Sequence, residues 1–311
     1  MDTIDVHQHL LPESLIAELA RRRKPPALVR RRGGGWTFKL EGEPDSPLLP
    51  ADVDVEDRWA RLRRDGIDRA LVSLSAALGV ETLPPDEAAT LIEAHHRGFE
   101  RLPARFGAWG AVPLREPDPA TVDASLDRGC AGVSLPATAL ASPAQLDRLG
   151  PLLERLQQRG APLFVHPGPV AATPRRAGAE LPGWWPALTD YVSQMQAAWF
   201  SFLHAGRPAH PRLRVVFAML AGGAPLQLER YAARGPGEIP SPDPLVFYDT
   251  SSYGPRMLAA MAAAVGAGQL VFGSDRPVLD DRAALPDGGL RQALLSANPR
   301  RLLTPRGKES R

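Results

Sequence analysis

The chain has little cysteine and little lysine, and each shortage narrows what the protein can be. Cys130 is the single cysteine among 311 residues, so no disulfide can form within the chain. This favours a reducing compartment, and we expect a cytoplasmic protein in which Cys130 is a small buried side chain. Lys24, Lys39 and Lys308 are the only lysines, and acidic residues nearly balance the arginines to give a formal net charge of +2. This balance does not point to any particular charged partner.

Long apolar runs are also missing. No stretch of the sequence approaches the roughly 18 apolar residues of a membrane-spanning helix, so we expect no membrane partner. The first ten residues, MDTIDVHQHL, contain no basic segment followed by an apolar run, and we therefore expect no signal peptide.

Short runs rich in β-branched residues alternate with longer amphipathic segments, which predicts parallel strands joined by right-handed helical crossovers. Helices are expected at Glu56–Arg64, Asp86–Leu102, Pro143–Arg159 and Pro255–Val265. The eight expected strands are Thr3–His7, Ala70–Ser75, Phe106–Val112, Ala131–Leu135, Pro162–His166, Arg214–Met219, Val246–Thr250 and Gln269–Gly273.

Eight strand–helix units predict an α/β fold of the (β/α)8 TIM-barrel type. The alternative is an open doubly wound sheet, but no glycine-rich phosphate-binding motif follows the first strand. We expect one domain over residues 1–303 and a flexible tail over residues 304–311.

Two segments interrupt the strand–helix rhythm. Residues 21–50 contain the run GGGWTFKLEGE, which predicts a small hairpin inserted after strand 1, and residues 168–186 are rich in proline and glycine. Both follow strands, so we expect both over the C-terminal face, where barrel active sites lie. The aromatic residues Trp36, Trp184 and Trp185 are candidates for an apolar lid over a flat substrate, with packing inside the hairpin or core as the alternative.

Three histidines and one aspartate stand at predicted strand ends. His7 and His9 are two residues apart, so they face the same side of the first strand and point together into the barrel mouth. His166 ends the fifth strand and Asp275 follows the eighth, and strand ends converge in a barrel. Imidazole and carboxylate ligands suit zinc, with manganese or iron as alternatives. The sequence therefore predicts one divalent metal bound by His7, His9, His166 and Asp275.

Two further aspartates are candidates for supporting this site. Asp249 ends the seventh strand and is expected to orient a metal ligand or contact substrate, and Asp5 faces the same side as His7. Histidine ligands usually have an oriented partner on their second ring nitrogen.

The other charged and imidazole side chains have simpler interpretations. His95 and His96 are expected on the outer face of a helix, and His204 and His210 near the bottom of the barrel, all as surface or capping residues. An arginine-rich run lies within residues 21–32. It is interpreted as a solvated loop that attracts an anionic small-molecule substrate, and we expect no nucleic-acid partner.

Several motifs occur together in a known order: IDVHQHLLPE, LFVHPG, FAMLAGGAP, YDTSS, VFGSDRP and NPRRLL. In them the sequence resembles the amidohydrolase-related family typified by aminocarboxymuconate-semialdehyde decarboxylase, from Ile4 to about Leu303. The resemblance implies a mononuclear metal held by His7, His9, His166 and Asp275, with Asp275 as the catalytic proton-transfer group. It also implies a small carboxylated substrate, and it makes a homodimer a fair expectation.

The sequence departs from the family after the sixth strand, where members usually have a histidine in an A-H-x-G-G pattern. Met219 takes that position in the run Ala218 to Gly223, and a thioether cannot transfer protons. Three functions stay open: non-oxidative decarboxylation, hydrolysis of an amide or lactone by metal-bound water, and binding of a metabolite or partner without catalysis. Met219 is itself a candidate substrate contact.

Overall fold

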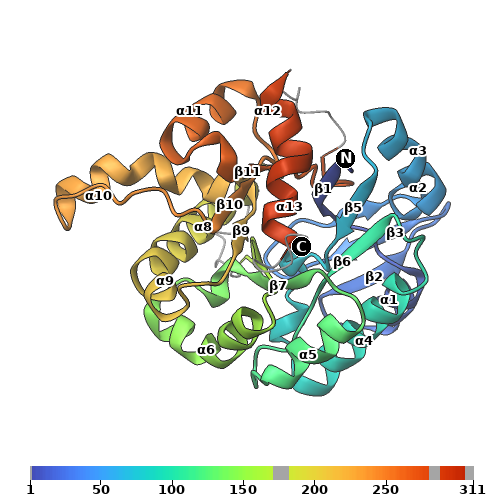
Figure 1. Cartoon of the computed structure of the whole chain (residues 1–311). Helices are drawn as coiled ribbons and strands as arrows, with labels where there is room; N and C mark the ends of the chain where they lie inside the picture. The colour runs from blue at the N-terminus through green and yellow to red at the C-terminus, as the bar shows by residue number, and fades with distance from the viewer. Residues whose placement is uncertain (1, 171–181, 280–287, 305–311) are drawn as a thin grey trace.

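Eight parallel strands form the centre of the molecule in a computed structural model that describes residues 2–170, 182–279 and 288–304 (Figure 1). Their order around the sheet is β1-β5-β6-β7-β8-β9-β10-β11, with every neighbouring pair parallel. The strands are β1 (Ile4–Gln8), β5 (Arg69–Val72), β6 (Phe106–Gly110), β7 (Gly132–Pro136), β8 (Leu163–His166), β9 (Val215–Phe217), β10 (Val246–Asp249) and β11 (Leu270–Val271).

The sheet closes on itself between its first and last strands. The main-chain N–H of Val6 donates to the carbonyl of Phe272 at 2.9 Å, and Gln8 forms an isolated parallel bridge with Arg276. Closure confirms the predicted (β/α)8 barrel, and each predicted strand is present within a few residues of its expected bounds.

Helices surround the strands and cover their outer faces (Figure 1). The four predicted helices are present as α3 (Val55–Asp65), α4 (Pro85–Phe99), α6 (Pro143–Gln158) and α11 (Pro255–Val265). The other α-helices are α1 (Glu13–Arg21), α2 (Pro50–Val53), α5 (Pro119–Asp127), α7 (Trp185–Leu188), α8 (Asp190–Ser201), α9 (Arg207–Ala209), α10 (Leu228–Arg234), α12 (Gly289–Gln292) and α13 (Asn298–Leu303). Segments of 3-10 or π-helix are η1 (Ala76–Leu78), η2 (Val80–Thr82), η3 (Ala137–Ala139), η4 (Phe202–Gly206), η5 (Met219–Gln227), η6 (Ala267–Gln269) and η7 (Ala293–Ala297).

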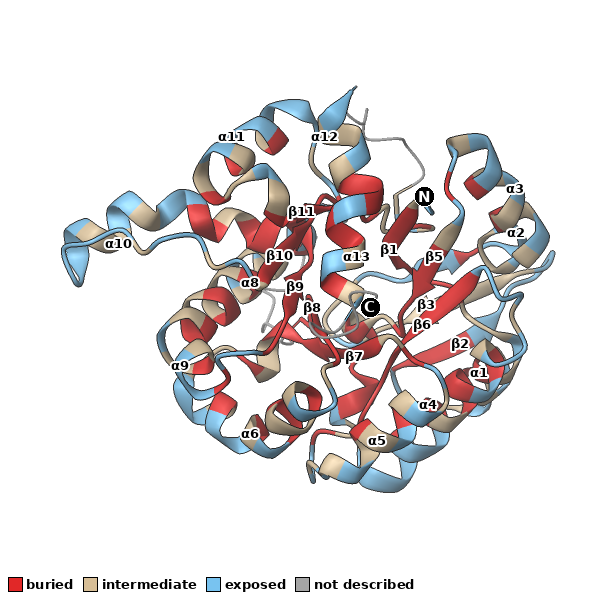
Figure 2. Ribbon diagram, viewed as in Figure 1, coloured by how far each residue is buried: buried red, intermediate tan, exposed pale blue. Residues whose placement is uncertain are grey.

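The barrel strands are buried along nearly all of their length, and the helices are buried mainly on the side that faces them (Figure 2). Leu146, Leu149, Leu153 and Leu156 form the buried stripe of α6, at the three- and four-residue spacing of an amphipathic helix. This stripe belongs to the largest hydrophobic cluster, together with the strand residues of the barrel wall.

The segment inserted after β1 folds as a three-stranded antiparallel sheet, one strand more than the predicted hairpin. Its strands are β2 (Ala27–Arg30), β3 (Trp36–Lys39) and β4 (Ser46–Leu48), with β3 in the middle. Trp36 packs against a second hydrophobic cluster that includes Leu28 and Leu48. The packing favours the structural interpretation of Trp36 over the substrate lid.

Within the described ranges, no helix is both long enough and apolar enough to cross a membrane. The centre of the predicted 168–186 segment and the tail from residue 305 onward lie outside the described residues.

Candidate metal centre

Four ligand atoms from three parts of the chain meet at the C-terminal end of the barrel. His7 lies on β1, His9 directly follows it, His166 ends β8, and Asp275 lies in the segment after β11. The Nε2 atom of His9 is 3.2 Å from Nε2 of both His7 and His166, and Oδ1 of Asp275 is 3.2 Å from His9 and 3.3 Å from His7. All four atoms lie within 4.8 Å of one another.

Hydrogen bonds on the far side of each imidazole determine which nitrogen carries the proton. Nδ1 of His7 faces Oδ2 of Asp249 at 2.7 Å, and Nδ1 of His166 faces the carbonyl of Pro167 at 2.8 Å. Nδ1 of His9 lies 3.2 Å from both the carbonyl and the hydroxyl of Ser73, and that hydroxyl donates to the carbonyl of Gln8 at 3.5 Å, so it can accept from the ring. Because carboxylates and carbonyls only accept hydrogen bonds, each neutral ring donates from Nδ1 and presents a lone pair at Nε2.

Three nitrogen lone pairs and a carboxylate oxygen therefore face one another, and Oδ1 of Asp275 has no hydrogen-bond donor. Such an arrangement of neutral rings is repulsive, and either a cation between the four atoms or, in its absence, a proton on one ring relieves the repulsion. Zinc–nitrogen bonds of about 2.05 Å in a tetrahedral site separate neighbouring ligand atoms by about 3.3 Å. The observed spacings of 3.2 and 3.3 Å match that value. The donor set fits a divalent metal.

The charges of the metal-free site favour a proton on His7. Burial lowers the pKa of His7, but Asp249 and Asp275 outweigh it, so the net result is a rise to about 9. Burial raises the pKa of Asp275, and the neighbouring imidazoles reverse this and hold it at about 2. Burial and the other two imidazoles lower the pKa of His166 well below its ordinary value. A metal ion entering the site must displace the proton of His7.

Asp249 is the residue that orients His7, as its position at the end of the seventh strand suggested. Its Oδ1 atom accepts from the main-chain N–H groups of Ser251 at 2.9 Å and Met219 at 3.1 Å, and from the hydroxyl of Ser251 at 2.5 Å. Asp249 is fully buried. Both of its oxygens are engaged, so the carboxylate holds the imidazole of His7 in one orientation.

Gly273 makes room for the contact between His7 and Asp249, and no local pattern in the sequence indicates this role. A Cβ atom built on Gly273 would lie 2.8 Å from Cβ of His7 and 2.9 Å from Cγ of Asp249. Both distances are too short for a real side chain. Only glycine at this position allows β1 and β10 to bring His7 and Asp249 together.

Asp5 supports the main chain instead of an imidazole. Its Oδ1 atom accepts from the main-chain N–H groups of His7 and Ser274, each at 3.1 Å, and its Oδ2 atom accepts from the side chain of Gln8 at 2.8 Å. The buried guanidinium of Arg58 donates to Gln8 at 3.0 Å and to the carbonyl of His9 at 3.1 Å. These contacts fix the seam between β1 and the segment that carries Asp275.

Met219 begins a left-handed turn at the end of β9. The residues from Met219 to Gly223 all have positive φ angles, between 49° and 74°. Side chains other than glycine rarely adopt this conformation, which costs about 1–2 kcal/mol per residue. The turn directs the Met219 N–H toward Asp249. The position where the family usually has histidine thus keeps a main-chain link to the ligand network.

The predicted aromatic contacts from residues 168–186 lie on the surface. Trp184 is 56% exposed and Trp185 is 38% exposed, with ring centroids 5.7 Å apart. Their role in substrate binding stays a prediction.

The prediction that His95 and His96 lie on the outer face of a helix was wrong. Both are buried, because α4 turns the stripe of Leu91, Ile92 and His95 toward the barrel. Nε2 of His96 accepts from the main-chain N–H of Ala111 at 3.2 Å. The three- and four-residue spacing from Leu91 was the available sequence signal. His210 is also buried, whereas His204 is exposed as expected.

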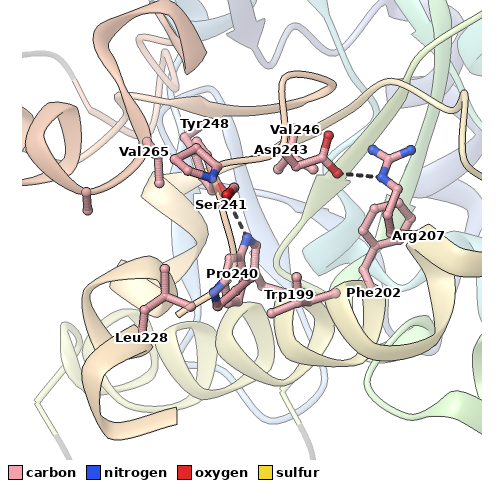
Figure 3. A pocket seen from close by; sticks show the side chains of 13 residues that line it. Trp199, Phe202, Arg207, Leu228, Pro240, Ser241, Asp243, Val246, Tyr248 and Val265 are labelled. Carbon is pink, nitrogen blue, oxygen red and sulfur yellow. Dashed lines mark hydrogen bonds and ion pairs between the residues drawn. The ribbon is translucent and has the colours of Figure 1, made fainter. Parts of the chain in front are cut away.

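A separate small cavity lies between α8, η4 and the segment before β10 (Figure 3). Trp199 donates to the hydroxyl of Tyr248 at 3.0 Å, and Arg207 pairs with Asp243 at 2.5 Å. Its volume of about 30 Å³ has room for only one or two water molecules. None of the four candidate ligands lines it, so the cavity is separate from the candidate metal centre.

The sequence profile of the amidohydrolase family matches residues 4–304, nearly the whole chain. The chain belongs to this family. The match spans all eight strands and all four candidate ligands.

Among curated proteins, the chain is similar to 2-amino-3-carboxymuconate-6-semialdehyde decarboxylase from Dictyostelium discoideum. The two are 23% identical over 252 residues, which cover 73% of this chain and 65% of the relative. The matched region thus spans just under two thirds of that relative's length.

Among solved structures, the chain is similar to the IDCase of Metarhizium anisopliae in its apo form, with a TM-score of 0.75, 20% identity and 97% of each chain covered. It is also similar to 5-carboxyvanillate decarboxylase from Novosphingobium aromaticivorans, a structure with bound manganese. There the TM-score is 0.73, with 16% identity and 97% of each chain covered. At these identities the likeness establishes the fold.

Proposed function

We propose that this protein is a metal-dependent decarboxylase that acts on a small carboxylic acid. The observation that carries the proposal is the convergence of three Nε2 lone pairs and the Asp275 carboxylate, with every Nδ1 engaged elsewhere. Decarboxylases among the relatives and Met219 at the histidine position support this reaction over hydrolysis.

A divalent metal held by His7, His9, His166 and Asp275 would bind the substrate carboxylate and stabilise negative charge that develops during the reaction. The nitrogen-rich ligand set favours zinc. The manganese in the 5-carboxyvanillate decarboxylase makes manganese the second candidate.

Asp275 is the proposed proton-transfer group. A metal ion binds only the ionised form of a carboxyl ligand, so Asp275 starts the reaction as a carboxylate when the metal is bound. It therefore first accepts a proton, from a substrate hydroxyl or carboxyl group, and then delivers it to carbon. As the bond to the carboxylate breaks, its electron pair stays on that carbon, which takes the proton from Asp275 while CO2 leaves.

Met219 is the reason to favour decarboxylation over hydrolysis. Hydrolysis needs a water molecule to be activated and a leaving group to be protonated, and loss of one general acid–base group typically slows a reaction about 10²- to 10⁴-fold. Decarboxylation needs no attack by water. The reaction therefore depends less on the imidazole that this chain lacks.

A substrate screen tests the proposal. Protein reconstituted with zinc or manganese is incubated with hydroxybenzoates, unsaturated aliphatic acids, amides and lactones. Two quantities are measured: the release of CO2, and the uptake of 18O from solvent water into the organic product. We expect CO2 release from an acid without 18O incorporation, abolished in the Asp275→Asn variant. Incorporation of 18O would instead identify a hydrolase. Saturable binding without turnover of any compound would identify a non-catalytic barrel.

A further inference from the structure

A hydrogen bond crosses the mouth of the barrel above the candidate metal centre. The hydroxyl of Tyr191, in the first turn of α8, donates to the carboxylate of Glu43, in the connection between β3 and β4. The two residues are 148 positions apart in the sequence. Each is half-buried.

The positions of the two elements show that this contact spans the opening. The insertion with Glu43 follows β1, whereas α8 follows β8, and these strands are four places apart in a closed ring of eight. They therefore stand opposite each other, and Figure 1 shows β2 and β3 on one side of the barrel and α8 on the other. β1 carries His7, and β8 carries His166.

The first turns of α8 are held against the strand ends that form the site. Gln194 accepts from the main-chain N–H of Gly168 at 2.8 Å and donates to the carbonyl of Pro169 at 3.2 Å, directly after His166. Gln196 donates to the carbonyl of Gly222 at 2.9 Å, in the turn after β9. Tyr191 is therefore fixed beside the ends of β8 and β9.

The mouth is acidic at this point. Burial raises the pKa of Tyr191, and Glu43, Asp275 and Asp190 raise it further, so the phenol stays a neutral donor within the electrostatic reach of the metal centre. Burial also raises the pKa of Glu43, and the charge of Asp190 acts in the same direction. Among the described residues, the charge that acts on Glu43 in this way is the carboxylate of Asp190.

We propose that Glu43, held by Tyr191, is a specificity-determining residue that admits substrates with a single carboxylate and a hydrogen-bond donor at the opposite end. This inference rests on the proposed function, which places the substrate carboxylate at the metal. The far end of a flat substrate then meets the Glu43 carboxylate. A hydroxyl donates a hydrogen bond to it, whereas a second carboxylate is repelled.

Two ligands of the same shape test the proposal on the metal-reconstituted protein at pH 8, well above the ordinary pKa of a glutamate. The dissociation constants of 3-hydroxybenzoate and benzene-1,3-dicarboxylate are measured by calorimetry, and their ratio is the readout. We expect the hydroxybenzoate to bind at least tenfold more tightly. The second carboxylate of the dicarboxylate and the carboxylate of Glu43, about 6 Å apart near a protein surface, repel each other enough to weaken binding by that factor.

Both variants should lower this ratio, by different amounts. Glu43→Gln removes the charge and should reduce the preference about tenfold, while Tyr191→Phe removes the hydrogen bond that holds Glu43 in place and should reduce it less. Glu41→Gln is the matched control, because Glu41 is exposed in the same connection, and it should leave the ratio unchanged. General damage to the fold would weaken the binding of both ligands together and would not change their ratio.

Each contrary outcome has a distinct meaning. An equal ratio in wild type and Glu43→Gln, with both ligands binding, overturns the role of Glu43 and leaves the proposed function intact. If neither ligand binds to metal-loaded wild type, the proposal that a carboxylate substrate binds the metal fails, and the role of Glu43 fails with it.

Discussion

The Nδ1 atom of His7 lies 2.7 Å from Oδ2 of Asp249, and both side chains are fully buried. The contact joins β1 to β10 and determines that Nε2 of His7 faces the other three candidate ligands. Asp249 thus acts on a metal ion only through His7, as a positioning residue.

The Asp249→Asn variant tests that role. The amide keeps the size of the side chain but removes the charge, so the imidazole is held less firmly and is a weaker base. We expect metal affinity to fall about 10- to 100-fold while the fold is retained. Competition with a chromophoric chelator measures the affinity. The control is Asp147→Asn, an exposed position on α6. Equal affinities in both variants and wild type would contradict the role of Asp249.

Metal binding should depend on pH in a direction that the site determines. The pKa of His7 is raised to about 9, so His7 is protonated below that pH in the metal-free protein, and the metal must displace this proton. Asp275, with its pKa near 2, is already ionised. Affinity should therefore rise about tenfold per pH unit from pH 6 to 8 and level off near pH 9. Calorimetry in buffers of different ionisation enthalpy should find about one proton released per metal bound. No proton release would show that His7 is neutral before the metal binds.

Glu81 makes a second pH-dependent prediction, away from the metal centre. Neither of its carboxylate oxygens has a hydrogen-bond partner, the side chain is fully buried, and burial raises its pKa to about 7. A carboxyl whose folded-state pKa is raised contributes stability below its unfolded-state value of 4.5, and this stability is lost as the pH rises through about 7. Glu81→Gln should therefore become more stable relative to wild type between pH 5 and pH 8, by up to roughly 3 kcal/mol.

Urea unfolding at several pH values measures this difference. Glu116→Gln, at an exposed position, is the control and should show no such trend. A difference between Glu81→Gln and wild type that stays constant with pH would show that Glu81 does not titrate in this range.

Met219→His tests whether the missing imidazole limits turnover. Residue 219 has a φ of 49°, a conformation in which histidine is more common than most side chains, so the replacement should fold. We expect turnover of the acid identified in the screen to rise by less than the roughly 10²-fold that a general acid–base group typically supplies, because decarboxylation needs no activated water, and metal content should be unchanged. Unchanged turnover in a metal-loaded Met219→His variant would show that this position takes no part in the reaction.

The sequence was sufficient to predict the barrel and the residues that converge at its mouth, because both predictions follow from periodicity. Two-residue spacing placed His7 and His9 on one face, and strand ends in a closed barrel had to bring His166 and Asp275 beside them. The same reasoning identified Asp249 as a candidate partner of a ligand.

Contacts between distant segments could not be predicted in this way. The Tyr191–Glu43 contact depends on how the insertion lies across the mouth, which no local pattern encodes. The need for glycine at position 273 arises only when β1 and β10 approach. The apolar stripe of α4 indicates the burial of His95, but imidazole is polar, and its polarity favours a surface position in a prediction from sequence.

Metal content tests the central claim most directly. Wild type and His166→Ala are purified without chelators, reconstituted with zinc or manganese, passed over a desalting column and analysed by plasma mass spectrometry. We predict about one divalent ion per chain in wild type and loss of that ion in His166→Ala, with the same thermal unfolding profile for the two metal-free proteins. The absence of metal from reconstituted wild type, or equal metal in the two proteins, would contradict the metal centre of His7, His9, His166 and Asp275.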